Sequence, residues 1–347
     1  MGIFGGGQND FFGLDIGTTA MRVVQLKNVS GRKELSHYGQ VGLAANVAAA
    51  ATPADKQALT QAIAQLVKTA GISTKNVAAN LPSSKVFTTV IDLDKLAPED
   101  LAKTINYQAD SFIPTPLAQS KIDWKITGDS PGNAKKVEVL LSSIENKVSE
   151  ERLQIIEAAG LNVLALEPDS LALTRALVAD ADNGALMVLD MDDLSTDLVI
   201  TVAGIPRLVR TIQLGAATVV RAAAQNMGVA DAQAQEYVFK FGLNKDGLEG
   251  KLYNAIIGTV DVLVGEIQKS IKFFQSRYGG VPLQKIIVTG GASTLPLFPL
   301  YVANKMALNV EIGNSWRNIT YPPARQDELL AVSNHFAVAV GLAERTR

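Results

Sequence analysis

Two short stretches of the sequence follow the same plan, and this repetition constrains the fold more than any other feature. In each, an apolar strand ends in an aspartate, a polar turn follows, and a second apolar strand returns. The first stretch is Gly13–Leu26 with Asp15, and the second is Ala185–Thr201 with Asp190. Similar units at two places in one chain indicate an internal duplication. We therefore expect two like domains whose hairpins point into one cleft, where Asp15 and Asp190 would flank the same phosphates and metal.

The residue types in the two turns are those that bind phosphate and magnesium. Because Gly17 has no Cβ, the backbone can come close to a ligand there. A carboxylate at a strand end can hold hydrated Mg²⁺, which prefers carboxylates, waters and phosphate oxygens. Hydroxyl and N–H donors for phosphate oxygens come from Thr18, Thr19, Ser195 and Thr196. A plain hairpin with a glycine turn is the alternative for either stretch alone.

The composition permits two globular domains and argues against several other classes of protein. The chain has 347 residues, of which 47% are hydrophobic and 19% charged, and its net charge is −2. This balance predicts neither a nucleic-acid surface nor a polybasic membrane patch. The chain has no cysteine, and His37 and His335 show no metal-ligand spacing. No run approaches the roughly 18 to 20 apolar residues of a membrane span, and the first residues lack the features of a secretory signal.

Two later stretches contain further candidate binding residues. The first, 285–294, reads as a buried strand that ends in Gly290 and Gly291, where the backbone can approach a flat ring or a phosphate. An ordinary strand-to-helix turn is the alternative. The second is the longest helical stretch, 246–278, in which three polar residues share one face: Glu266, Lys269 and Ser270. On a helix taken alone, a solvated charge pair is the better interpretation of that face.

The ordered set of these motifs resembles the actin-like ATPase superfamily, which includes actin, DnaK-type chaperones, sugar kinases and FtsA. Gly13–Leu26 is similar to its first phosphate loop, and Asp190–Thr196 to its second. The segment 285–294 resembles its adenosine motif. Two further segments resemble its connecting helices, one beginning with Glu167-Pro168-Asp-Ser-Leu-Ala and the other spanning Asn334–Glu344.

Within that superfamily the chain is most similar to the PilM family, the cytoplasmic, FtsA-related actin-like proteins of type IV pilus assembly. Three segments carry the resemblance: the opening 11–26, the stretch from Tyr107 through Pro114 and Pro116 to Ile122-Asp-Trp124, and 266–274. Two positions differ from the family pattern. Asp192 replaces a glycine of the second phosphate loop, and Leu214-Gly215 replaces a pair of glycines. We expect these changes to weaken nucleotide binding and turnover.

The resemblance implies an α/β, actin-like ATPase fold, in which two RNase H-like domains face a nucleotide cleft and a small α+β unit is inserted in the first domain. Combined with the expected elements, it divides the chain as follows: a flexible tail, 1–10; a first domain, 11–82 and 161–182; the inserted unit, 83–160; a second domain, 183–333; and a C-terminal helix returning to the first domain, 334–347. The polar linker at 180–184 separates the two halves.

The resemblance also implies ATP and Mg²⁺ between the halves. Asp15 and Asp190 would organise the metal. The phosphates would be held by Gly17, Thr18, Thr19, Ser195, Thr196 and Gly215. The nucleoside would be framed by Glu266, Lys269, Gly290 and Gly291. Glu167 would position a water if hydrolysis occurs, with Asp190 as its catalytic partner, and the protein would be at most a weak ATPase.

What the family implies functionally is a cytoplasmic scaffold that binds the N-terminal cytoplasmic peptide of a PilN-type inner-membrane protein, in a groove between the first domain and the inserted unit. Such partners, including other inner-membrane components of pilus assembly, would recruit it to the inner face of the cytoplasmic membrane, without nucleic-acid binding or direct membrane insertion. Two alternatives are a small-molecule kinase of the same superfamily and an FtsA-like cell-division protein. We find no candidate catalytic base for the first, and no amphipathic tail after the last helix for the second.

Overall fold

The computed structural model describes residues 10–179 and 184–346, and these form three β-sheets and two compact units. Unit 1 contains the described residues up to Pro82, together with Lys147–Ala176 and the chain from Ser315 onward. Unit 2 contains Ser83–Asn146 and Leu177–Asn314. The expected tail at 1–9 and most of the expected linker at 180–184 lie outside the described residues.

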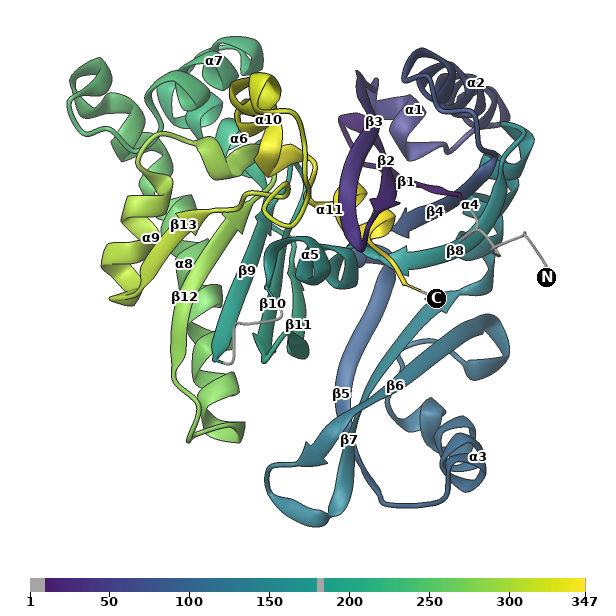
Figure 1. The fold of residues 1–347 in the computed structure, drawn as a ribbon. Helices are drawn as coiled ribbons and strands as arrows, with labels where there is room; N and C mark the ends of the chain where they lie inside the picture. The colour runs from purple at the N-terminus through teal and green to yellow at the C-terminus, as the bar shows by residue number, and fades with distance from the viewer. Residues whose placement is uncertain (1–9, 180–183, 347) are drawn as a thin grey trace. The chain divides into compact units, whose positions relative to one another are not determined.

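Unit 1 is built on a five-stranded sheet whose first three strands are antiparallel and whose last two run parallel to the central strand (Figure 1). In spatial order the strands are β3 (Arg32–Gly42), β2 (Ala20–Val29), β1 (Phe12–Ile16), β4 (Asn76–Leu81) and β8 (Asn162–Pro168). Its helices are α1 (Ala45–Ala49), α2 (Pro53–Thr69), α4 (Asn146–Ala158), α5 (Asp169–Leu177), α10 (Gln326–Val332) and α11 (Ala337–Ala343).

Alternation along β1 decides what each face of this sheet contacts. Phe12, Leu14 and Ile16 are buried in a core that α2 and α4 complete. Because neighbouring residues of a strand point to opposite faces, Gly13 and Asp15 face the other side. A Cβ at Gly13 would lie 2.3 Å from the Ala339 carbonyl oxygen of α11, so α11 packs directly on the strand backbone.

The sheet of unit 2 repeats this strand order, which confirms the duplication expected from the two hairpins. In spatial order its strands are β11 (Ile205–Ile212), β10 (Thr196–Val202), β9 (Ala185–Met191), β12 (Leu283–Thr289) and β13 (Asn309–Ile312). One face is covered by four helices, whose apolar residues share a core with β9, β10 and β12: α6 (Ala216–Met227), α7 (Asp231–Phe241), α8 (Lys251–Arg277) and α9 (Phe298–Met306).

The remainder of unit 2, Ser83–Asn146, is called the insert below. It is a three-stranded antiparallel sheet in the order β5 (Val86–Asp94), β7 (Asn133–Glu145) and β6 (Ser120–Ser130), packed against α3 (Pro98–Gln108). Leu101 and Ile105 of α3 are buried against Ile91, Val139 and Leu141 of the strands. Figure 1 shows β5, β6 and β7 as long ribbons with α3 beside them.

The boundaries expected from the sequence differ from these units in three places. The inserted unit was expected to extend to residue 160, but α4 contributes Ile155 and Ile156 to the core of unit 1. The insert groups with the second half of the chain and not with the first. The second domain was expected to extend to residue 333, but Ser315 and the residues after it group with unit 1. There, Thr320 continues the pairing at β3, since its carbonyl accepts the Leu35 N–H at 3.0 Å.

The long helix α8 is continuous from Lys251 to Arg277, although Gly258 and Gly265 in its interior indicated a possible break. Tertiary packing explains the difference, because its apolar face is buried along its whole length, from Leu252 to Phe274. Among the described helices, none is both long enough and apolar enough to cross a bilayer.

Two glycines in helices of similar geometry predict opposite effects of the same substitution. A Cβ at Gly341 in α11 would lie 1.9 Å from the carbonyl oxygen of Ala172 in α5, so Gly341→Ala should cost about 2 kcal/mol or more by overpacking. At Gly258 in α8, a Cβ would meet no atom within 4 Å. Gly258→Ala should therefore stabilise the protein by about 0.5–1 kcal/mol through helix propensity. Thermal and urea unfolding followed by circular dichroism measures both; a Gly341→Ala protein as stable as the wild type would contradict the close contact.

Candidate nucleotide site

The first hairpin, formed by β1 and β2, has a tight turn with two threonines exposed to solvent. The Gly17 N–H donates to the Ala20 carbonyl oxygen at 3.0 Å, and a Cβ at Gly17 would lie 3.0 Å from that oxygen. Glycine is favoured here by this close approach, and its φ is not in the left-handed region. Thr18 and Thr19 are exposed, as a phosphate-binding role requires.

Asp15 is buried below this turn and is held by Asn80 of β4. The Asn80 Nδ2 donates to Asp15 Oδ1 at 3.1 Å and to Asp169 Oδ1 at 2.9 Å. Its Oδ1 accepts the Ile16 N–H at 2.8 Å. Arg22 Nη1 lies 3.5 Å from Asp15 Oδ2. A buried charge needs such partners, and together they fix the orientation of the carboxylate.

Arg152 and His335 are two further basic residues of unit 1 whose pKa values are lowered by burial. Burial lowers the pKa of the Arg152 guanidinium, while the carboxylates of Asp169 and Asp15 raise it. Burial and the charge of Arg22 lower the pKa of His335, which favours its neutral form. The sequence analysis did not identify Asn80, Arg152 or Asp169; an asparagine inside the apolar strand 76–81 was the available signal for the first.

The second phosphate hairpin has a more enclosed turn. The Asp192 N–H donates to the Ser195 carbonyl oxygen at 3.0 Å, and the Asp192 carbonyl accepts the Ala216 N–H at 2.9 Å. A Cβ at Gly215 would lie 2.5 Å from the Asp192 carbonyl oxygen, so the turn lies against the backbone at the start of α6. The Asp192 side chain is exposed and Ser195 is half-buried.

Thr196, expected to hold phosphate, is directed to the core side of this hairpin. It is fully buried, and its Oγ1 donates to the Leu214 carbonyl oxygen at 2.6 Å. Leu214 itself is part of the apolar core. Among the expected phosphate ligands of this hairpin, Ser195 and Gly215 therefore remain the better placed.

Asp190 lies directly beside the glycine that follows β12. Asp190 is buried and pairs in register with Thr289 of β12. Gly290 has a φ of +83°, and a Cβ there would lie 2.5 Å from Asp190 Oδ1. Only glycine combines this backbone conformation with this approach. The structure thus brings the second phosphate hairpin and the Gly290-Gly291 motif together, and Gly291 begins a short 3₁₀ turn, Gly291–Thr294.

A further carboxylate, Asp197, lies beside Asp190 and was missed in the sequence analysis. The two residues are direct partners on β10 and β9, so their side chains share a face of the sheet. Thr211 Oγ1 donates to Asp197 Oδ1 at 2.6 Å. Burial raises the pKa of Asp197 to about 6, and the charge of Asp192 adds to the increase. An aspartate within the apolar strand 196–202 was the signal in the sequence.

Glu266 and Lys269 are held in a surface ion-pair cluster. Lys269 Nζ lies 2.6 Å from Glu266 Oε1, and Arg210 Nη2 of β11 lies 3.3 Å from Glu266 Oε2. The Arg210 Nη1 also donates to Ser270 Oγ at 2.8 Å. The hydrogen bond from Lys269 lowers the pKa of Glu266.

The register places this cluster on the other face of the sheet from Asp190. Arg210 pairs with Leu198, whose side chain is in the core beneath α8. The adjacent residue, Thr211, pairs with Asp197 and therefore points to the opposite face. The structure does not bring Glu266 and Lys269 together with Asp190 and Gly290.

Glu167, expected to position a water, is engaged at both oxygens. It is buried at the end of β8, Arg345 Nη1 lies 2.7 Å from its Oε2, and Arg175 forms an ion pair with its Oε1. It thereby joins β8 to α5 and to Arg345, the second residue after α11. Within the described part of the chain, no group of three or more acidic or histidine side chains is arranged to hold a metal by itself.

The raised pKa of Asp197 predicts a pH dependence of stability. In the folded protein Asp197 keeps its proton up to about pH 6, whereas in the unfolded chain it loses it near its ordinary value, about pH 4. Protonated Asp197 therefore adds up to about 3 kcal/mol to the free energy of unfolding below about pH 4. This contribution is lost as the pH rises through 6. Melting temperatures of wild type and Asp197→Asn from pH 4 to 7 should differ in slope, with the variant flatter; parallel curves would contradict the raised pKa.

Comparison with known proteins identifies the family and the fold of this chain. The family model for type IV pilus assembly protein PilM matches residues 13–347. A solved PilM-PilN type IV pilus biogenesis complex has a TM-score of 0.84 at 22% identity, covering 97% of this chain and 98% of that one. The ethanolamine utilization protein EutJ from Carboxydothermus hydrogenoformans has a TM-score of 0.56 at 13% identity, with 96% and 88% covered. MreB 5 of Spiroplasma citri bound to AMPPNP has a TM-score of 0.55 at 12% identity, with 96% and 95% covered.

At these identities the solved structures establish the fold, which is the actin-like ATPase fold expected from the sequence. The family model covers nearly the whole chain and is specific for one branch of that fold. The chain therefore belongs to the PilM family of type IV pilus assembly proteins.

Proposed function

We propose that this protein is a nucleotide-responsive scaffold of a type IV pilus or related secretion machine, which binds Mg-ATP and the N-terminal cytoplasmic peptide of a PilN-type inner-membrane protein. The observation that carries the proposal is the family match over residues 13–347. Partner binding is supported by the solved PilM-PilN complex of the same fold. Such a protein would act in the cytoplasm, at the inner face of the membrane that holds its partner.

Nucleotide binding is supported by the two hairpins and by the fold neighbour that binds AMPPNP. Asp15 and Asp190 are buried carboxylates at strand ends, and carboxylates are what a hydrated Mg²⁺ prefers. The phosphates would contact the open turn of Gly17, Thr18 and Thr19, with Ser195, Gly215, Gly290 and Gly291 from unit 2. Bound Mg²⁺ would neutralise charge on the phosphates. Thr196, Glu266 and Lys269 have weaker support, because each is engaged elsewhere.

The site favours binding over turnover. Both oxygens of Glu167 already accept from arginines, which leaves fewer acceptor positions for an attacking water. We therefore propose slow or absent hydrolysis, which is compatible with a scaffold whose conformation responds to nucleotide occupancy.

We propose that the peptide binds at a pocket of about 450 Å³ in unit 2, between the insert and β11, and not in the groove between the first domain and the inserted unit that the resemblance implied. It is lined by the start of β5, the end of β7, residues 209–211 of β11, and Pro114 and Thr115. The last two belong to the Phe112–Pro116 turn through which the insert resembles the family. We propose that this turn contributes to holding the peptide.

The side chain of Asp192 should weaken nucleotide binding. Two unit charges about 5 Å apart repel by roughly 3 kcal/mol at an effective dielectric near 20, and solvent and Mg²⁺ reduce this. Asp192→Gly should bind Mg-ATP several-fold more tightly by calorimetry, and Asp192→Asn should recover part of that gain. Asp15→Ala, which removes a proposed metal ligand, should abolish most binding and serves as the control. Weaker binding in both Asp192 variants would identify Asp192 as a metal ligand instead.

A substitution at Thr115 tests whether this turn takes part in peptide binding. In calorimetry with a synthetic N-terminal cytoplasmic peptide of a PilN-type protein, Thr115→Arg should weaken binding about ten-fold or more, because the long cationic side chain would fill the pocket. The matched control is Gln108→Arg, at an exposed position of α3 outside the pocket. Equal peptide affinity in wild type and Thr115→Arg would exclude this turn from the peptide site.

A further inference from the structure

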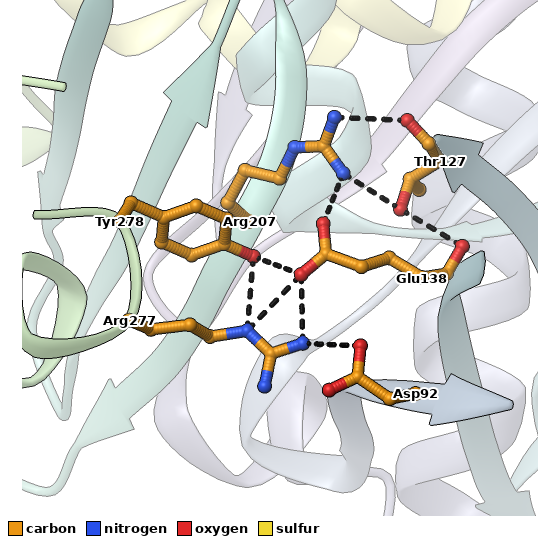
Figure 2. Close-up of polar contacts among 6 residues, drawn as sticks. All are labelled: Asp92, Thr127, Glu138, Arg207, Arg277 and Tyr278. Atoms are coloured by element: carbon orange, nitrogen blue, oxygen red, sulfur yellow. Dashed lines mark hydrogen bonds and ion pairs between the residues drawn. The ribbon is translucent and has the colours of Figure 1, made fainter. Parts of the chain in front are cut away.

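Six polar residues of unit 2 form a network in which the carboxylate of Glu138, on β7 of the insert, is buried and the side chains of Arg277 and Asp92 are partly exposed (Figure 2). Glu138 has no exposed surface. Its Oε1 accepts the Tyr278 hydroxyl at 2.5 Å and the Arg277 Nη2 at 2.7 Å. Its Oε2 forms an ion pair with Arg207 of β11. Arg277 also contacts Asp92 of β5 at 2.8 Å. Each oxygen of Glu138 therefore has a donor from outside the insert.

Arg207 also contacts a β-bulge in the insert. The pairing of β6 with β7 shifts between Ile126 and Gly128, which leaves Thr127 as a bulged residue. Arg207 Nη2 donates to the Thr127 carbonyl oxygen at 2.9 Å, and its Nη1 donates to Thr127 Oγ1 at 3.1 Å. A Cβ at Gly128 would lie 3.2 Å from Arg207 Nη2, so the glycine leaves room for the guanidinium.

The charges of the network balance. Glu138 and Asp92 are opposed by Arg207 and Arg277. Burial and the hydrogen bond to Glu138 raise the pKa of Tyr278 to about 12, so the phenol stays neutral and donates. The cluster thus holds two carboxylates, two guanidinium groups and a donor, in a site where an unpaired charge would be strongly unfavourable.

Such a network fixes the position of the insert against β11 and α8 more firmly than a surface ion pair would. Exposed pairs exchange partners with water at little cost. A fully buried carboxylate that loses one arginine has no water to replace it, so this arrangement has few alternatives. The insert residues Asp92, Thr127 and Glu138 are thereby joined to the sheet and helix that supply Arg207 and Arg277 (Figure 2).

From this arrangement we propose that the Glu138 network is a rigid coupler, which makes the insert move with the sheet that carries Asp190. This inference rests on the proposed function: nucleotide at Asp190 would bias the position of that sheet, and the network would transmit the change to the peptide-binding insert. Peptide affinity would then depend on nucleotide, and nucleotide affinity on peptide by the same factor.

The test compares wild type with Glu138→Met/Arg207→Met, which replaces one ion pair with apolar side chains and leaves Arg277 paired with Asp92. Peptide Kd is measured by calorimetry with and without saturating Mg-AMPPNP. Wild type should show a change of about five-fold or more, the usual lower range of allosteric coupling. The variant should bind each ligand alone within about two-fold of wild type but show no change in peptide Kd on adding nucleotide.

The matched control is Asp261→Met/Lys305→Met, which removes an ion pair between α8 and α9 without touching the insert. It should keep the coupling. Tyr278→Phe is a milder second variant, removing one hydrogen bond to Glu138, and should reduce the coupling in part. Full coupling in Glu138→Met/Arg207→Met would overturn the proposal, as would wild type that binds both ligands independently.

A direct measurement separates failure of the coupler from failure of the proposed function. The chain contains no cysteine, so spin labels can be attached at two introduced cysteines alone. Lys125 of the insert and Phe273 of α8 are both exposed. The distance distribution between labels there should be narrow in wild type and broad in Glu138→Met/Arg207→Met, without any ligand. Equally narrow distributions would overturn the coupler itself. Absence of peptide or nucleotide binding in wild type, with this difference present, would overturn only the proposed function and the linkage built on it.

Discussion

Burial of carboxylates is the constraint on which the polar architecture of this protein depends. A carboxylate removed from water must be paired or protonated. Glu138 is paired with two arginines and a tyrosine, and Glu167 with two arginines. Asp15 has Asn80 and Arg22. Asp197 is met by the hydroxyl of Thr211 instead, and its pKa rises to about 6. Each arginine therefore joins the element that supplies it to the element that carries the buried carboxylate.

The two sheets share a strand order but differ at the turns of their candidate phosphate hairpins. In unit 1 the turn of Thr18 and Thr19 is open, and the carboxylate below it is fixed by Asn80. In unit 2 the turn lies against the start of α6, and Gly290 approaches the carboxylate of Asp190 from the neighbouring strand. Each half thus supplies a carboxylate and close backbone, by different local means.

The insert contacts the rest of unit 2 and also lines the pocket proposed for the peptide. Its sheet and α3 form a small core of their own, while Glu138 and Thr127 contact β11 and the end of α8. A scaffold that reports nucleotide state needs a rigid element between its nucleotide site and its partner site. It does not need fast chemistry. The double arginine pairing of Glu167 and the network around the buried Glu138 are consistent with those two requirements.

Both hairpins, the aspartates at their strand ends and Gly290 followed from the sequence, because turn chemistry and apolar periodicity are local properties. The start of α2 at Pro53, for example, is set by a capping box between Thr52 and Asp55. Tertiary structure alone decided the face on which Glu266 lies, the burial of Thr196, and the partners of Asp15, Glu167 and Glu138. Those outcomes depend on sheet register and on residues as far apart as Glu138 and Arg277, 139 positions along the chain. No local pattern encodes such a pairing, because a buried charge selects its partner by proximity in the folded core.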